Sequence, residues 1–353
     1  MSPHVFEGKR PHTGDFPSKT AGGAVGRADL LRRGVTERLE ELVGGLAADA
    51  DPGDVYVGWV AAADAAGCPA RFRASGVDGW GFPGWSPALA AGAVGRVALA
   101  RHLDRHVTAV AASNPALPHP LAAVKTWMKE ARETPTSPIA EWVTQLTRQG
   151  DRAALAVTAS LATRWIAGFV RVLGWPLPEG LVLVVDDPGS PSARRGTPAF
   201  RPRLSSTRRV AIAVASKPDA MVGTVAPSGR FDVLFHRANS SDDLTLAERA
   251  AFEATAASLA IGIVPRAVVL TVADTGERLR FPVADDLLER GADLAVDVVR
   301  QRLRASEVAG DEYGDAVPSS ACRYCSERET CPPGVAWLIR PGRRHNGLPV
   351  LTS

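Results

Sequence analysis

The cysteines are the residues whose spacing points most directly to chemistry. The chain has 353 residues and four cysteines, with Cys68 alone and Cys322, Cys325 and Cys331 in a C-x2-C-x5-C run that ends at Pro332. Four thiolates complete one tetrahedral zinc site or hold one iron–sulfur cluster. A shared centre would join two distant segments and remove loop entropy from the unfolded chain. The cysteines alone do not choose between zinc and [4Fe-4S].

Disulfide bonds are the alternative use of these cysteines. The segment Met1 to Phe16 is polar and lacks the apolar stretch of a secretory signal peptide. We therefore expect a cytoplasmic, reducing location, where such spacing more often holds a metal or a redox group. No apolar run approaches the roughly 20 residues of a membrane span, so we expect no membrane association.

Composition bounds the function only loosely. The hydrophobic fraction of 45% and the charged fraction of 22% are ordinary for a globular protein. A net charge of +3 and a pI of about 8.8 permit nucleic-acid binding without requiring it. The sequence has no G-x-x-x-x-G-K-[ST] phosphate loop, so we expect no helicase motor within it.

Helical periodicity dominates the first half of the chain. Apolar spacing predicts helices over 28–48, 56–66, 87–110 and 121–132, and further helices in two or more pieces over 138–174. The residues before 28 are rich in Gly, Pro, Ser and Thr and are expected to form a flexible arm.

Short apolar runs, typical of strands, characterise the second half. Strands are predicted over 181–185, 210–214, 231–236, 267–272 and 278–283, and helices over 244–261 and 285–306. The predicted organisation is an arm at 1–28, a mainly helical region with the first cysteine at 29–180, a core with the cysteine run at 181–335, and a tail at 336–353.

The order of these elements and cysteines resembles the RecB-like branch of the PD-(D/E)xK nuclease superfamily. Its iron–sulfur form, seen in AddB-type helicase–nuclease subunits and CRISPR-associated RecB-like exonucleases, has one cysteine before the core and then C-x2-C-x5-C-P. The resemblance covers about 62–332. It implies an α/β (α+β) fold with a restriction-endonuclease-like mixed central sheet flanked by helices. It also implies a [4Fe-4S] cluster at Cys68, Cys322, Cys325 and Cys331 that joins the N- and C-terminal parts.

The catalytic motifs of that family are only partly present. Asp219, in Ser-Lys-Pro-Asp after a predicted strand, matches the first acid, which would hold Mg or Mn in an active enzyme. Leu234 stands where the second acid belongs, and His236 stands where the lysine belongs. Arg96 replaces the upstream histidine, and Glu248 begins a Glu-x-x-x-Phe version of the Q-x-x-x-Y motif.

Nearby side chains offer replacements for the missing groups. Asp232 shares a strand face with Leu234 and His236, because strand side chains alternate. Glu248 or Glu253 on the following helix can reach the sheet end, and His102 and His106 follow Arg96. A solvated surface residue is the alternative for each. The candidate catalytic set is Asp219, His236, Asp232 and Glu248.

Two functions of different class follow from these residues. The first is an iron–sulfur-stapled protein with a degenerate nuclease centre, which binds DNA or scaffolds a helicase or another subunit in DNA repair, recombination or defence. The second is an active metal-dependent DNA exo- or endonuclease with a rearranged site. The predicted DNA-binding residues are Arg96, Arg194, Arg195, Arg201 and Arg203, with help from Arg101 and Arg105.

Overall fold

Helices precede strands along most of the chain, and the resulting fold is mixed α/β with two small mixed sheets. This arrangement confirms the α+β class at the coarse level. The computed structural model describes residues 22–46, 55–74, 85–107, 119–135, 137–173, 181–184, 199–205, 210–224, 231–238, 244–272, 275–305, 314–319, 322, 325, 327 and 329–339.

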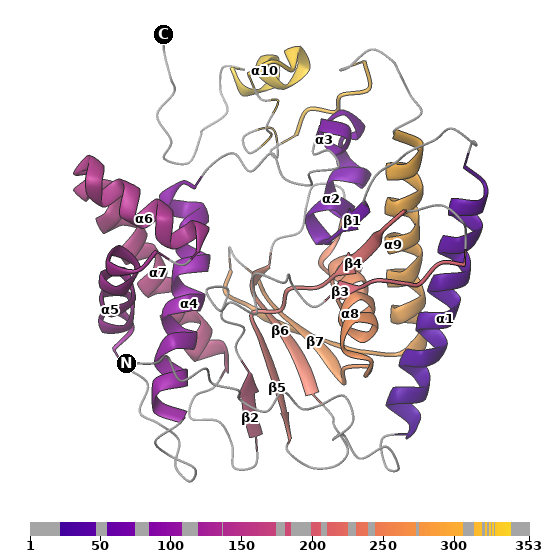
Figure 1. Ribbon diagram of the computed structural model, residues 1–353, viewed down its shortest axis with the longest axis horizontal. Helices are drawn as coiled ribbons and strands as arrows, with labels where there is room; N and C mark the ends of the chain where they lie inside the picture. The colour runs from indigo at the N-terminus through magenta and orange to yellow at the C-terminus, as the bar shows by residue number, and fades with distance from the viewer. Residues whose placement is uncertain are drawn as a thin grey trace.

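The helices expected in the first half are present. They are α1 (Gly22–Gly44), α2 (Trp59–Gly67), α3 (Pro69–Ala74), α4 (Pro87–Val107), α5 (Pro120–Glu133), α6 (Pro138–Gln149) and α7 (Arg152–Leu173). Helix α1 begins inside the arm expected at 1–28, whose remainder lies outside the described residues. Helices α4 to α7 form one group beside the sheets (Figure 1). A Cβ at Gly95 would lie 2.7 Å from the Trp165 ring, so glycine permits the close contact between α4 and α7.

Helix α7 bears on the expectation that no segment of the chain spans a membrane. Among the described residues, α7 is the one helix that is long and apolar enough to cross a membrane. One such helix is weak evidence for a span, because core helices of soluble proteins pass the same test. Trp165, Ile166 and Phe169 on α7 are buried in a core that also contains Leu234 of the sheet.

The larger sheet has the strand order β2-β5-β6-β7-β8. Its strands are β2 (Leu181–Val184), β5 (Ala220–Thr224), β6 (Phe231–Ala238), β7 (Ala267–Val272) and β8 (Arg278–Pro282). Strands β6 and β7 are parallel, and the other neighbouring pairs are antiparallel. This parallel pair requires a crossover, which α8 (Leu246–Ile261) supplies.

The smaller sheet was only partly expected. Strand β4 (Ile212–Ala215) lies between β1 (Val55–Val57), to which it is parallel, and β3 (Ala199–Phe200), to which it is antiparallel. Residues 56–66 were predicted to be one helix, yet the segment begins as strand β1 because Val55 and Val57 pack into the core beside Ile212. Strands β3 and β5 were also not predicted.

Helix α8 lies at the centre of the fold and contacts strands of both sheets. Residues 250–259 are all buried, as expected of a helix surrounded by protein. A capping box between Thr245 and Glu248 starts the helix, and Gly262 at φ 82° ends it in the left-handed region.

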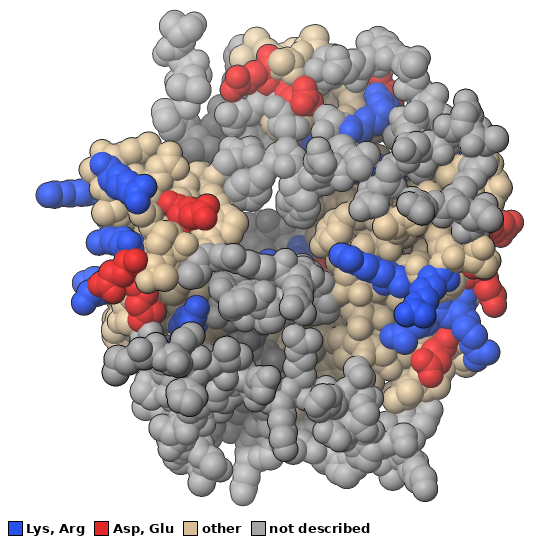
Figure 2. Space-filling view, in the orientation of Figure 1, with Lys and Arg blue, Asp and Glu red and all other residues tan. Residues whose placement is uncertain are grey.

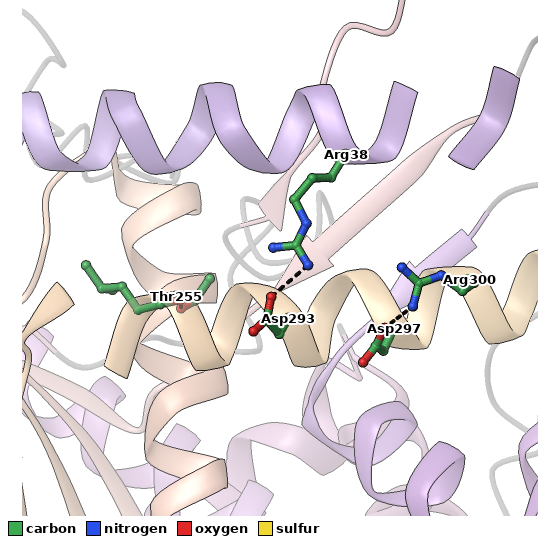
Figure 3. A network of polar contacts seen from close by, with 6 residues as sticks. Arg38, Thr255, Asp293, Asp297 and Arg300 are labelled. Carbon is green, nitrogen blue, oxygen red and sulfur yellow. Dashed lines mark hydrogen bonds and ion pairs between the residues drawn. The ribbon is translucent and has the colours of Figure 1, made fainter. Parts of the chain in front are cut away.

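Helix α9 (Asp285–Ala305) packs between α8 and α1. Figure 3 shows Arg38 of α1 reaching Asp293 of α9, with a nitrogen–oxygen distance of 2.7 Å, and the Asp297–Arg300 pair one turn further along α9. A Cβ at Gly291 would lie 2.1 Å from the Ala251 carbonyl oxygen, so glycine is required where α9 crosses α8. The short helix α10 (Pro332–Leu338) follows Cys331 and lies above α3 in Figure 1.

Candidate functional site

The four cysteines converge at the end of the molecule formed by α3 and α10. All four are buried, none forms a disulfide, and all line one small cavity, which we call the cysteine cavity. Its other lining residues are Ala70, Arg71, Ala316, Val317, Pro318, Glu327 and Gly334. The fold therefore brings Cys68 to the C-terminal run.

Backbone groups orient the cysteine side chains. The Ser319 N–H donates to Cys322 Sγ at 3.3 Å, and the Arg71 N–H donates to Cys68 Sγ at 3.4 Å. A Cβ at Gly334 would lie 3.4 Å from Cys331 Sγ and 3.7 Å from Cys322 Sγ, so the α10 backbone approaches both sulfurs closely. These contacts fix the positions of the sulfurs at the cavity.

Four thiols around one cavity match the donor set of an iron–sulfur cluster or a zinc ion. As arranged, however, the described residues contain no group of three or more His, Cys, Asp or Glu that could hold a metal ion. Burial raises the pKa of the Cys325 thiol, and the positive charge of Arg71 acts in the opposite direction. Metal binding would require these thiols to lose their protons.

Ionic contacts hold the Cys68 segment to distant parts of the chain. Arg73 of α3 forms a two-contact ion pair with Asp315, which lies just before the C-terminal cysteines. The Arg302 Nη1–H of α9 donates to the Phe72 carbonyl at 2.6 Å, and the guanidinium lies 3.9 Å from the centre of the Phe72 ring. Protein contacts thus bring the cysteine segments together.

A second site occupies the middle of the molecule. This central cavity is open and has a volume of about 720 Å³. It is lined by α2, α4, α7, β6, α8 and the segment between β4 and β5. Figure 2 shows a hollow near the middle of this face, with Lys or Arg atoms visible inside it. The charged lining residues are Arg96, Lys217, Asp219, Arg249 and Glu253, and His236 also faces the cavity.

Asp219 is buried at the floor of the central cavity. Its carboxylate lies 2.9 Å from Arg96 Nε and accepts a hydrogen bond from the His236 backbone N–H at 2.7 Å. The Asp219 N–H in turn donates to the Leu234 carbonyl at 2.8 Å. The structure therefore brings together Asp219, Leu234 and His236, three positions that the sequence analysis singled out. The cation that pairs with the Asp219 carboxylate is Arg96.

The other two motif positions pack against aromatic side chains. The Leu234 side chain is 1% exposed and packs in the core with Trp165 and Phe169. The His236 ring packs edge-on against Trp165 and Phe169, with ring centres 5.1 Å and 5.8 Å away. A core leucine and an aromatic-packed histidine occupy the positions of the expected acid and lysine.

Glu253 is the acid that α8 contributes to this cavity. It accepts a hydrogen bond from the Ser216 hydroxyl at 2.7 Å and is fully buried. Burial raises its pKa to about 7, while the nearby Arg249 charge lowers it and the Asp219 charge raises it. The sequence had suggested Glu248 or Glu253, and the candidate set carried Glu248. The available signal was a lone acid inside the apolar run Ala-Ala-Phe-Glu-Ala.

Two candidate acids have other partners, which corrects their expected placement. Asp232 is buried, and its carboxylate accepts hydrogen bonds from Arg266 at 2.8 Å and 2.9 Å, with Arg280 at 3.5 Å. Glu248 accepts a hydrogen bond from the Thr245 backbone N–H at 2.5 Å in the capping box. Neither residue lines the central cavity.

The predicted DNA-binding arginines are dispersed. Arg201 and Arg203 are exposed on the segment after β3, and Arg101 is half-buried on α4. Arg96 points into the central cavity and pairs with Asp219. Arg194 and Arg195 lie outside the described residues, as do the side chains of His102, Arg105 and His106.

Comparison of the chain with models of protein families, with curated proteins and with solved structures finds no match.

Proposed function

We propose that this chain is a RecB-like PD-(D/E)xK-fold protein with a degenerate nuclease centre, which binds DNA and holds an iron–sulfur cluster through its four cysteines. Helix α7 is followed by β2, β5, β6, α8 and β7 of the larger sheet, with β3 and β4 of the smaller sheet inserted between β2 and β5. This order, with Asp219 beside β6, supports the restriction-endonuclease-like sheet. The convergence of the cysteines on one cavity supports the cluster.

One observation carries the non-catalytic assignment: Arg96 pairs with the single motif acid that remains. A divalent ion needs several hard oxygen ligands. Here the Arg96 guanidinium lies against Asp219, and its positive charge would repel such an ion. Arg249 and Lys217 also line the cavity, so among the described residues its basic side chains outnumber its acidic ones. Such a lining favours a phosphate backbone over a metal ion.

DNA binding is tested by fluorescence anisotropy with labelled single- and double-stranded oligonucleotides over a range of salt concentrations. Lys217→Glu in the cavity and the pair Arg201→Glu and Arg203→Glu are expected to weaken binding at least tenfold and reduce the salt dependence. Arg278→Glu with Arg290→Glu, on exposed parts of β8 and α9, is the matched control. Unchanged affinity in both test variants would reject this surface as the binding site.

An active nuclease with a rearranged centre is the second candidate. It is favoured by Glu253, which faces the same cavity as Asp219 and Lys217. Incubating linear DNA with Mg²⁺ or Mn²⁺ separates the two functions. We expect no cleavage; cleavage that disappears in both Asp219→Ala and Glu253→Ala would establish the second candidate. A cytoplasmic location and a helicase or other recombination or defence subunit as partner belong to the same proposal.

A further inference from the structure

Arg71 has a feature that the fold alone does not explain. Its Nε–H donates to Asp64 at 2.6 Å, yet Nη1 of the same guanidinium is buried and has no hydrogen-bond partner among the described residues. The residue is 9% exposed and lines the cysteine cavity. Burying a charged donor without an acceptor lowers the stability of the folded protein. An acceptor bound in this cavity would offset that free-energy cost.

The contents of the cavity identify the kind of acceptor. Besides Arg71, its lining consists of the four cysteines, Glu327 and small or apolar residues. Four thiolates around a [4Fe-4S]²⁺ cluster would carry a net charge of about −2, counted from the ligand set alone. The positive charge of Arg71, next to that anion, would offset part of the negative charge, and the interaction is strong because little water reaches the buried cavity.

We propose that the Arg71 guanidinium is the charge partner of a cysteine-bound [4Fe-4S] cluster and sets its reduction potential. This inference rests on the cluster in the proposed function and adds the residue that tunes it. Arg71 acts through the bound cluster and is not a ligand. Uptake of one electron makes the cluster more negative, so an adjacent cation stabilises the reduced form and raises the potential.

Asp64 supplies the opposing charge. It lies on α2, is half-buried and pairs with Arg71, with Arg302 also close enough to act on its charge. Two arginines near one carboxylate leave net positive charge on this side of the cysteine cavity. Removal of Asp64 should therefore shift the potential in the direction opposite to removal of Arg71.

The test is a redox titration of full-length protein purified without oxygen, with dithionite as the electron donor and absorbance and electron paramagnetic resonance as readouts. Arg71→Met keeps the stem of the side chain and removes the charge. We expect it to favour the oxidised cluster about tenfold, a fall of about 59 mV for one electron. Arg71→Lys should recover most of the wild-type potential, and Asp64→Asn should raise it.

A purely structural role for the Arg71–Asp64 pair predicts a different pattern. Both Arg71→Met and Asp64→Asn would then lose cluster content, and the potential of the remaining cluster would stay at the wild-type value; that result overturns the inference. If Arg71→Met fails to fold, an Asp64→Asn potential at or below the wild-type value overturns it alone. Wild-type protein with zinc or no iron rejects the cluster and this inference together, while the anisotropy assay tests DNA binding separately.

Discussion

The carboxylate of Asp219 and the guanidinium of Arg96 form an ion pair of 2.9 Å between the segment after β4 and helix α4. These residues lie far apart in the sequence, and the pair connects the helical group to the sheet. Because Asp219 also accepts the His236 N–H, both of its oxygens are engaged. The carboxylate that matches the first acid of the nuclease motif is therefore held by an arginine and a backbone N–H.

The first prediction follows from this pair. Arg96→Met leaves the Asp219 carboxylate buried without its cation and should lower the free energy of unfolding by about 2 to 3 kcal/mol, measured by urea denaturation. Adding Asp219→Asn should recover part of the loss, since the amide oxygen still accepts from His236. Additive effects of the two substitutions would show that the residues do not interact.

Glu253 predicts a specific pH dependence of stability. Its pKa is raised from 4.5 to about 7 in the folded protein, so the folded state holds this proton more tightly than the unfolded state. The resulting stability is fully present below pH 4.5 and is lost as the pH rises through about 7. The shift corresponds to about 3 kcal/mol in the pH 4.5 to 7 window.

Glu253→Gln isolates that contribution, because other titrating groups cancel in the comparison with wild type. The amide still accepts from Ser216 and carries no charge. The variant should be the more stable protein at pH 8, and its advantage should shrink towards pH 5. Parallel pH profiles in urea denaturation would contradict the raised pKa.

Gly291 predicts the sensitivity of the contact between α8 and α9. Gly291→Ala places a methyl group within 2.1 Å of the Ala251 carbonyl oxygen and 2.4 Å of Thr255 Oγ1, so the helices must separate. We expect a loss of about 2 kcal/mol or more. Gly34→Ala on α1 meets no atom within 4 Å and should gain up to about 1 kcal/mol from helix propensity. Equal thermal shifts in the two variants would refute the close approach.

Sequence reasoning predicted the elements that local pattern determines. Helix α4 was predicted with ends within a few residues, and β7 was recognised from its apolar run. Helix α7 was predicted only as part of a helical stretch in two or more pieces over 138–174, without the position of the break that precedes it. Strands β1 and β3 have three and two residues, so their pairing with β4 depends on the tertiary fold. Strand β5 contains Gly223 and Met221, which weaken the strand pattern.

The candidate sites show the same limit. Asp232 and Glu253 are both acids in apolar surroundings in the sequence. Only the structure reveals that Arg266 covers the first and that the second faces the central cavity. The cysteine spacing succeeded in one respect: Cys68 does lie with the C-terminal run. Four cysteines that bind one centre must lie together in the fold, so their spacing predicts a contact between distant segments. A single acid such as Asp232 or Glu253 has many possible partners, so the sequence does not predict its position.

The last prediction concerns the four cysteines as one unit. Protein purified without oxygen should be brown, with broad absorbance near roughly 400 nm and four thiolates per cluster. Cys68→Ala and Cys331→Ala should each abolish the absorbance and destabilise the fold to the same extent, by about 5 to 6 kcal/mol on a loop-entropy estimate. The double variant should be no less stable than either single variant, because one missing ligand already opens the loop.

Val317→Ala is the control: Val317 lines the same cavity and has no thiol, so this variant should retain the absorbance. Independent, additive effects of the two cysteine substitutions would show that Cys68 and Cys331 do not share a centre, and the protein contacts Arg73–Asp315 and Arg302–Phe72 would then be the connection between the two ends of the chain.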